Sequence, residues 1–223
     1  MARIVMKFGG TSTANTQNLR ICAKHVARKA KTGQQIVVVV SAPAGMTDQL
    51  IARIEEADPT GQHLDEADVV LAAGEQINAG LMVMCLRELG LAARSWLGWQ
   101  AGLITDENFG KARLATAKTD ALLDSLVAGE IVVLAGFQGV TPSGRISTLG
   151  RGGSDVSAVA LASALAATRC DIYTDVQGVF SADPAIVPTA ELLTSISAAE
   201  MLEMASSGAK VLHGRSVELA MAK

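Results

Sequence analysis

Aromatic side chains are scarce in this 223-residue chain, which holds four Phe, two Trp and one Tyr. The hydrophobic core must therefore consist mainly of aliphatic and small residues, in a composition that is 49% hydrophobic and includes 21 glycines. That composition is typical of a well-buried α/β protein. Because two tryptophans do not make a stacking platform for nucleic acid, we interpret Trp96 and Trp99 as packing residues.

The chain also lacks an excess of positive charge, with a formal net charge of −3. A broad nucleic-acid interface normally requires a basic face. The charge balance therefore disfavours a nucleic-acid partner and favours a small molecule.

Cysteine is rare, and Cys22, Cys85 and Cys170 are widely spaced without a C-x-x-C motif. An odd, unclustered set indicates reduced and mostly buried thiols rather than disulfides or metal ligands. No apolar segment of signal-peptide length opens the sequence, and no stretch approaches the ~18 uncharged apolar residues of a membrane span. We therefore expect a cytoplasmic protein with no membrane partner.

Apolar runs of strand length alternate with segments of helical periodicity. The expected strands are 4–8, 36–40, 92–97, 131–135 and 170–174, with a small hairpin at 140–148. The expected helices are 15–31, 48–57, 65–73, 76–89, 119–128, one opening near 154, 197–208 and 216–222, and 98–110 is expected to be irregular. This alternation predicts an α/β fold: a mostly parallel open sheet with helices on both faces, in three αβα layers. One domain of two lobes is the simplest organisation.

The stretch 148–167 begins as a glycine-rich turn and continues as a helix of small residues. Its glycines let the backbone approach a ligand closely, and Ser154 or Asp155 is a candidate N-cap. The helix would direct free N–H groups and its positive dipole end into the turn. Arg151 adds a guanidinium suited to a carboxylate or phosphate. The turn is therefore expected to hold an anionic group.

Further polar residues follow the expected strands, at the sheet edge where open α/β sheets bind ligands. Two lysines, Lys7 and Lys210, two glycine-rich turns and the central Asp155 together indicate phosphate chemistry. The turns match neither a Walker P-loop nor a G-x-G-x-x-G dinucleotide fingerprint.

Seven segments, in order along nearly the whole chain, resemble motifs of aspartate kinases, which have the amino acid kinase fold. They are K-F-G-G-T-S at 7–12, V-S-A at 40–42, A-G-E at 73–75, G-F-Q-G at 136–139, T-L-G-R-G-G-S-D at 148–155, Y-T-D-V at 173–176 and G-A-K-V-L-H at 208–213. The resemblance implies a catalytic domain with an amino-acid-binding lobe at about 1–135 and a nucleotide-binding lobe at about 136–223.

The activity implied by this resemblance is transfer of the γ-phosphoryl group of MgATP to the side-chain carboxylate of L-aspartate, giving 4-phospho-L-aspartate. That reaction opens the biosynthesis of lysine, threonine and methionine. A carboxylate with a pKa of about 3.9 is already ionised at pH 7 and needs no general base. Positioning and charge stabilisation must therefore do most of the catalytic work. The implied cofactors are ATP and Mg²⁺, and a homodimer is an expected assembly.

The resemblance also assigns site residues. Catalysis would rest on Lys7 and Lys210, which flank the phosphoryl group, and on Asp155, which holds the lysines in place. Arg151 would hold a substrate carboxylate and Glu75 the α-ammonium group. The implied nucleotide-binding residues are Lys7, Phe8, Gly9, Gly10, Thr174, Asp175, Phe180, Lys210 and Val211. The implied aspartate-binding residues are Ser41, Thr47, Glu75, Arg151, Gly152, Gly153 and Ser154, with Phe137 lining the same pocket. No protein residue is implied as a metal ligand.

Three departures from the family pattern qualify these expectations. Ala185 stands where an arginine usually follows Asp-Pro, and loss of its charged contact, worth ~1.5–3 kcal/mol, predicts weaker ATP binding. Gly214 replaces a common proline, which would loosen the loop carrying Lys210. The sequence also has no paired ACT modules, so no site for feedback by lysine or threonine is expected. An excised domain and a natural short form both remain open.

Two alternatives to an aspartate kinase remain. One is another amino acid kinase, acting on acetylglutamate, glutamate or UMP. The other is a nucleotide- or amino-acid-binding fragment without turnover. The T-L-G-R-G-G-S-D and A-G-E segments favour aspartate kinase over the first alternative.

Overall fold

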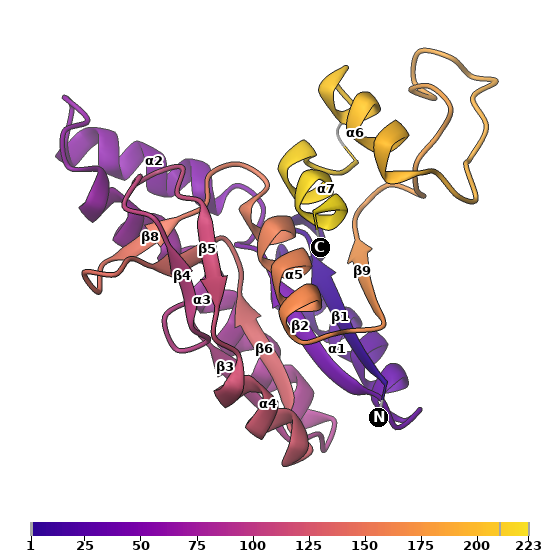
Figure 1. The fold of residues 1–223 in the computed structure, drawn as a ribbon, viewed down its shortest axis with the longest axis horizontal. Coiled ribbons are helices and arrows are strands. Elements are labelled where there is room, and N and C mark those ends of the chain that lie inside the picture. Colours follow the sequence, from indigo (N-terminus) through magenta and orange to yellow (C-terminus); the bar gives the residue numbers. More distant parts are fainter. Residues whose placement is uncertain (1, 210, 223) are drawn as a thin grey trace.

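The computed structural model describes residues 2–209 and 211–222, and two sheets organise it (Figure 1). The larger sheet has five parallel strands, in the order β3 (Ala93–Trp96), β6 (Ile131–Ala135), β2 (Gln35–Val40), β1 (Arg3–Phe8) and β9 (Arg169–Tyr173). The smaller, mixed sheet has the order β5 (Leu114–Ala117), β4 (Leu103–Thr105), β7 (Gln138–Val140) and β8 (Ile146–Thr148). The expected mostly parallel α/β fold is confirmed.

The register of the central strands sets the position of the site. Strands β1 and β2 pair in parallel from Arg3 with Gln35 to Phe8 with Val40. Their carboxyl ends therefore lie level with each other, and the segments that follow them emerge at one edge of the sheet. Both strands are almost continuously buried, as expected when helices cover both faces of a parallel sheet.

Helices cover the five-stranded sheet on both faces (Figure 1). On one face, α1 (Thr16–Ala30) and α3 (Leu64–Glu88) form a core with the sheet, and on the other face α4 (Asp120–Val127) and α5 (Gly153–Ala164) form a second core. The 3₁₀ turn η1 (Thr11–Thr13) precedes α1. These two cores confirm the three-layer arrangement.

The remaining helices lie outside these layers. Helix α2 (Met46–Ala57) packs on α3, and α6 (Ala198–Ser206) and α7 (Gly214–Met221) pack on each other, with α7 also against α5. Helix α2 and helix α6 lie on opposite sides of the molecule (Figure 1). Helix α2 has no buried residue, so it packs only loosely on the rest of the fold near the carboxyl edge of the sheet.

Helix α3 corrects the expectation of a break at Gly74 and Glu75, because it runs unbroken for 25 residues. A Cβ atom at Gly74 would lie 2.8 Å from the Cβ of Ala42, in the segment after β2. This glycine therefore permits close helix packing instead of ending the helix. The continuous helix carries Asp68, Glu75 and Asn78 into the interior.

By length and composition alone, α3 could also cross a membrane, with a mean hydropathy of 1.6 in its most apolar window. Glu75 interrupts this stretch, so the expectation that no run of ~18 uncharged apolar residues exists is not contradicted. Half of that window is buried inside the fold. A core helix meets the same criterion, and α3 forms a large part of one core.

Helix α5 begins two or three residues earlier than an N-cap at Ser154 or Asp155 would place it, so neither residue is its N-cap. The N-cap is Gly152, in the left-handed conformation with φ of 72° and without a side-chain capping bond. Ser154 and Asp155 therefore lie within the first turn. Their side chains are thus available to the adjacent cavity.

The segment 98–110, expected to be irregular, contains β4, which pairs with β5 and β7. A three-residue strand is too short to give a clear pattern of alternation. Its place is fixed by contacts with strands far along the chain. One such contact is the 2.5 Å hydrogen bond between the Thr105 and Ser147 hydroxyls.

The cysteines are unpaired, as expected: Cys22 and Cys85 are buried and Cys170 is half-buried. Trp96 is buried in the core, whereas Trp99 is 50% exposed. The packing role is confirmed for Trp96, which belongs to a core cluster, and stays a prediction for the half-exposed Trp99.

Candidate functional site

A cavity of about 510 Å³ opens at the carboxyl ends of β1, β2 and β6, beside the N-terminus of α5. It brings together residues predicted to bind nucleotide and residues predicted to bind aspartate. Among the predicted residues, its lining includes Lys7, Gly10, Ser41, Thr47, Glu75, Phe137, Arg151, Gly152, Gly153, Ser154 and Asp155.

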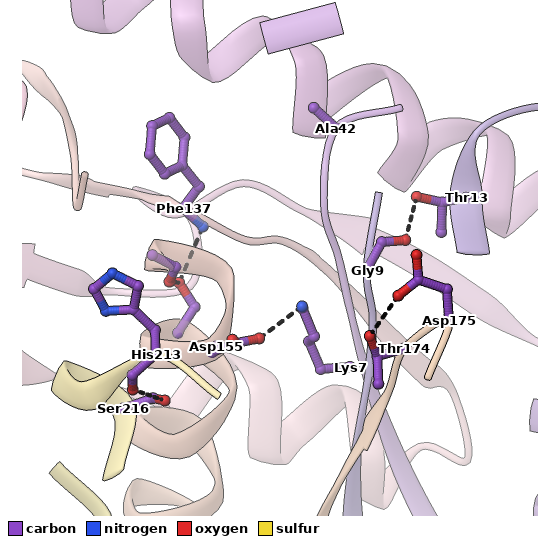
Figure 2. A network of polar contacts seen from close by, with 12 residues as sticks. Lys7, Gly9, Thr13, Ala42, Phe137, Asp155, Thr174, Asp175, His213 and Ser216 are labelled. Atoms are coloured by element: carbon purple, nitrogen blue, oxygen red, sulfur yellow. Dashed lines mark hydrogen bonds and ion pairs between the residues drawn. The ribbon is translucent and has the colours of Figure 1, made fainter. Parts of the chain in front are cut away.

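Lys7 and Asp155 form an ion pair within this cavity, with 2.6 Å between Nζ and Oδ1. The lysine comes from the end of β1 and the aspartate from the first turn of α5, and Figure 2 shows the two side chains pointing toward one another. Their side chains are only 11% and 12% exposed. Asp155 therefore fixes the ammonium group of Lys7 at the cavity wall.

The turn after β1 leaves room for this lysine. A Cβ atom at Gly9 would lie 3.6 Å from Lys7 Nζ, and one at Gly10 would lie 2.9 Å from the Ala42 carbonyl oxygen. The Gly9 carbonyl accepts hydrogen bonds from the backbone and hydroxyl of Thr13 (Figure 2). Both glycines thus lie where the turn passes close to Lys7 and to the segment after β2.

Glu75 is a buried carboxyl group facing the cavity, with 5% of the residue exposed. Its Oε1 accepts a hydrogen bond of 3.0 Å from the backbone N–H of Ala42, whereas Oε2 has no hydrogen-bond partner among the described residues. Burial raises the pKa of Glu75 to about 7, against the lowering effect of backbone hydrogen bonds. A buried acceptor with a free oxygen is suited to a cationic ligand such as an ammonium group.

The glycine-rich turn needs its glycines for backbone conformation and for space. Gly150 and Gly152 both have φ of 72°, in the left-handed region that favours glycine. A Cβ atom at Gly152 would lie 2.3 Å from the ring of His213, and one at Gly153 would lie 2.8 Å from the ring of Phe137. The turn is therefore packed between α7 and the segment after β6.

Phe137 has φ of 69°, which is unusual for a bulky residue. Its backbone N–H donates to Ser157 Oγ at 3.1 Å, and that hydroxyl donates to the Gly153 carbonyl at 2.9 Å. The first of these bonds is drawn in Figure 2. This chain of bonds fixes Phe137, a cavity-lining residue, to the first turns of α5.

Several residues predicted to bind nucleotide do not line this cavity. Phe8 is buried and stacks on Tyr173, with 4.7 Å between ring centroids. Thr174 and Asp175 are exposed beyond β9 and are bonded to each other, while Phe180 forms an isolated bridge with Leu192. Gly9 and Val211 also stand outside the cavity lining. Lys210 lies outside the described residues.

The cavity also includes residues absent from the predicted set: Pro43, Ala44, Gly45, Asp48, Ile51, Leu71 and Gly110. Two of them follow from helical spacing, because Ile51 lies four residues after Thr47 and Leu71 four residues before Glu75. Gly110 comes from a segment without a sequence signal for this location.

The amino acid kinase family model matches residues 2–223. The chain belongs to the amino acid kinase family. Among curated proteins, it is similar to an aspartokinase of Rickettsia felis, with 46% identity over 99% of this chain and 56% of that protein. An aspartokinase of Bacillus sp. strain MGA3 is 49% identical over 99% of this chain and 53% of that protein. The chain thus spans about half the length of these curated relatives.

Solved structures of aspartate kinases are also similar to this chain. An aspartate kinase from Synechocystis has a TM-score of 0.86 and 44% identity, covering 97% of this chain and 36% of that one. Aspartokinase III of E. coli, in complex with aspartate and ADP, has a TM-score of 0.88 and 32% identity, covering 98% of this chain and 59% of that one.

Proposed function

We propose that this chain is the catalytic part of an aspartate kinase, transferring the γ-phosphoryl group of MgATP to the side-chain carboxylate of L-aspartate. The observation that carries the proposal is that one cavity combines the Lys7–Asp155 pair with Glu75 and Arg151. Similarity to aspartokinases over 99% of the chain supports this choice over other acceptors.

The acceptor-binding side of the cavity is suited to an amino acid. Glu75 Oε2, buried and without a described partner, would receive the α-ammonium group. Arg151 would pair with a substrate carboxylate, for which a planar guanidinium is well shaped. Ser41 and Thr47 line the same cavity and would add hydrogen bonds, while the backbone of Gly152, Gly153 and Ser154 would form its floor.

The phosphoryl-transfer side needs positive charge, because an anionic carboxylate must approach an anionic phosphate. Lys7 supplies that charge, and its ion pair with Asp155 fixes the ammonium in advance. The N-terminus of α5 adds a positive dipole end. We propose that Lys210 supplies the second charge and that the backbone of Gly9 and Gly10 contacts phosphate oxygens.

MgATP would bind as a complex in which phosphate oxygens and water ligate the metal, as is common for Mg²⁺. The described residues contain no cluster of three His, Cys, Asp or Glu able to hold a metal ion by themselves. Bound Mg²⁺ would neutralise phosphate charge. We propose that Phe8, Thr174, Asp175, Phe180 and Val211 complete the nucleotide site.

The same proposal gives the chain its larger setting. Residues up to about 135 form the amino-acid-binding lobe and those from about 136 the nucleotide-binding lobe. The reaction belongs to the cytoplasmic route from aspartate to lysine, threonine and methionine. A homodimer remains a prediction for this chain.

The test is ADP release from MgATP with L-aspartate, L-glutamate, N-acetyl-L-glutamate and UMP as acceptors, with hydroxylamine to trap an acyl phosphate. We expect release of ADP with formation of a hydroxamate, dependent on L-aspartate. Equal or greater turnover with another acceptor would reject the assignment to aspartate.

Binding without turnover is the second candidate function, and Ala185 favours it. This exposed residue lacks the arginine side chain that the family pattern usually places after Asp183 and Pro184. A folded chain that binds ATP and L-aspartate but releases no ADP would support this second function.

A further inference from the structure

Two segments far apart in sequence, 110–112 and 148–150, lie side by side behind the cavity. The backbone N–H of Ala112 donates to the Thr148 carbonyl at 2.9 Å. Gly110 and Gly150 line the cavity, and Arg151 follows directly. The position of this paired backbone therefore determines the point from which the side chain of Arg151 extends.

Helix α3 holds the pair from one side through the fully buried Asp68. This carboxylate accepts the Thr148 backbone N–H at 2.7 Å, the Thr148 hydroxyl at 2.5 Å and the Gly110 N–H at 3.0 Å. Both oxygens are therefore used within the fold.

Helix α7 holds the pair from the other side through Arg215. Nη1 donates to the Leu149 carbonyl, and Nη2 donates to the Ala112 carbonyl at 3.1 Å. A Cβ atom at Gly150 would lie 3.6 Å from Nη1, so the guanidinium also passes close to the turn. One rigid fork thus bridges the two segments, which a lysine with its single nitrogen would not reproduce.

We propose that Arg215 is a positioning residue for the acceptor amino acid. By holding the Leu149 and Ala112 carbonyls, it fixes the backbone from which Arg151 extends, although it does not line the cavity itself. This inference rests on the proposed function, because it assigns Arg151 to the grip on L-aspartate.

Helix α7 has other anchors, so loss of Arg215 is expected to leave the helix in place. Val217 is buried, and Leu219 packs on a small cluster formed by Ala112, Leu149 and Val156. The Ser216 hydroxyl donates to the His213 carbonyl at 2.7 Å at the start of the helix. The role of Arg215 can therefore be separated from folding.

The experiment compares the 223-residue wild type with Arg215→Ala, Arg215→Gln and Arg215→Lys. For the Ala and Gln variants we expect the KM for L-aspartate to rise about tenfold, with kcat and the KM for ATP changed less than threefold. Arg215→Lys should be intermediate, because it restores one contact. Millimolar methylguanidine should partly restore the KM of Arg215→Ala.

The control is Arg20→Ala, which removes an exposed arginine of α1 paired with Glu88 of α3. Both helices cover the face of the sheet opposite to α5. This variant should leave both KM values unchanged. An unchanged KM for L-aspartate in Arg215→Ala and Arg215→Gln would overturn the inference. Equal increases in both KM values with a lowered Tm would overturn it too, because they indicate general loosening.

If the wild type releases no ADP, the proposed catalysis is contradicted. The inference about Arg215 is then tested by measuring the binding of L-aspartate to the wild type and to Arg215→Gln by calorimetry. Weaker binding by Arg215→Gln than by the wild type retains it. Equal binding rejects it, and no binding by the wild type rejects both the inference and the proposed substrate.

Discussion

At the scale of single residues, the buried carboxyl of Glu75 links stability to pH. Burial raises its pKa from 4.5 to about 7 in the folded chain, so the folded state binds this proton more tightly than the unfolded state. Its contribution to the free energy of unfolding is complete below pH 4.5 and is lost as pH rises to about 7. The shift corresponds to about 3 kcal/mol.

Glu75→Gln should remove this pH dependence and keep the acceptor for Ala42. We expect the variant to be more stable than wild type at pH 8, by up to about 3 kcal/mol, in denaturant unfolding followed by circular dichroism. The same variant should bind L-aspartate at least tenfold more weakly, because the ammonium group loses a charged partner. Glu55→Gln, on the exposed side of α2, is the matched control. Unchanged stability at pH 8 would contradict the cost assigned to this buried charge.

Lys7→Met should reduce kcat by about a hundredfold to a thousandfold, the scale expected for loss of one preorganised electrostatic contact. It should also destabilise the fold, because the largely buried carboxylate of Asp155 loses the lysine that compensates its charge. Lys7→Met combined with Asp155→Asn should recover stability but no activity. Lys24→Met, an exposed change on α1, should leave both quantities unchanged. Near-normal kcat in Lys7→Met would remove the lysine from the proposed mechanism.

At the scale of elements, α6 depends on a capping box. The Ser197 hydroxyl accepts the Glu200 backbone N–H at 3.2 Å, while the Glu200 carboxylate accepts the Ser197 N–H at 2.9 Å. Ser197→Ala should therefore cost about 1 kcal/mol of helix stability, measured as a lower midpoint in urea. Ser195→Ala, two residues earlier and also exposed, should cost less than half as much. Similar losses in the two variants would argue against the cap.

The sequence predicted the elements that carry strong local patterns. Strands β1, β2 and β6 are apolar runs, and α1 and α6 have clear helical periodicity or caps, so their positions agree within a few residues. The expected break in α3 failed because Gly74 serves packing against Ala42. Strand β4 was missed because long-range pairing, which no short window of sequence contains, determines it.

The site followed similar rules. Lys7, Glu75 and Asp155 belong to recognisable motifs at the ends of strands or in helix starts, and the fold brings them to one cavity. Gly110 and Arg215 carried no local signal, because their roles arise only where two distant segments meet. Sequence therefore predicts chemistry-bearing groups better than the residues that hold them in place.

At the scale of the whole molecule, the central strands of the sheet and the segment 174–197 differ in how deeply they are buried. Strands β1, β2 and β6 are central to two cores, whereas residues 174–197 are largely exposed. Amide hydrogen exchange should therefore be slowest in those strands and at least a hundredfold faster in most of 174–197, as measured by mass spectrometry. Added MgADP should slow exchange in 174–197 if this segment holds nucleotide. Exchange in 174–197 as slow as that in β2 without MgADP would contradict this prediction.

The placement of the three cysteines makes the molecule convenient for site-specific labelling. Burial raises the pKa of Cys22 to about 11 and that of Cys170 to about 12, and it also raises the pKa of Cys85. Because the thiolate is the nucleophile that attacks thiol reagents, the native thiols should react slowly at neutral pH. A single dye introduced through Glu55→Cys would therefore report selectively on α2. Its fluorescence during titration with L-aspartate would show whether this loosely packed helix moves when the cavity fills.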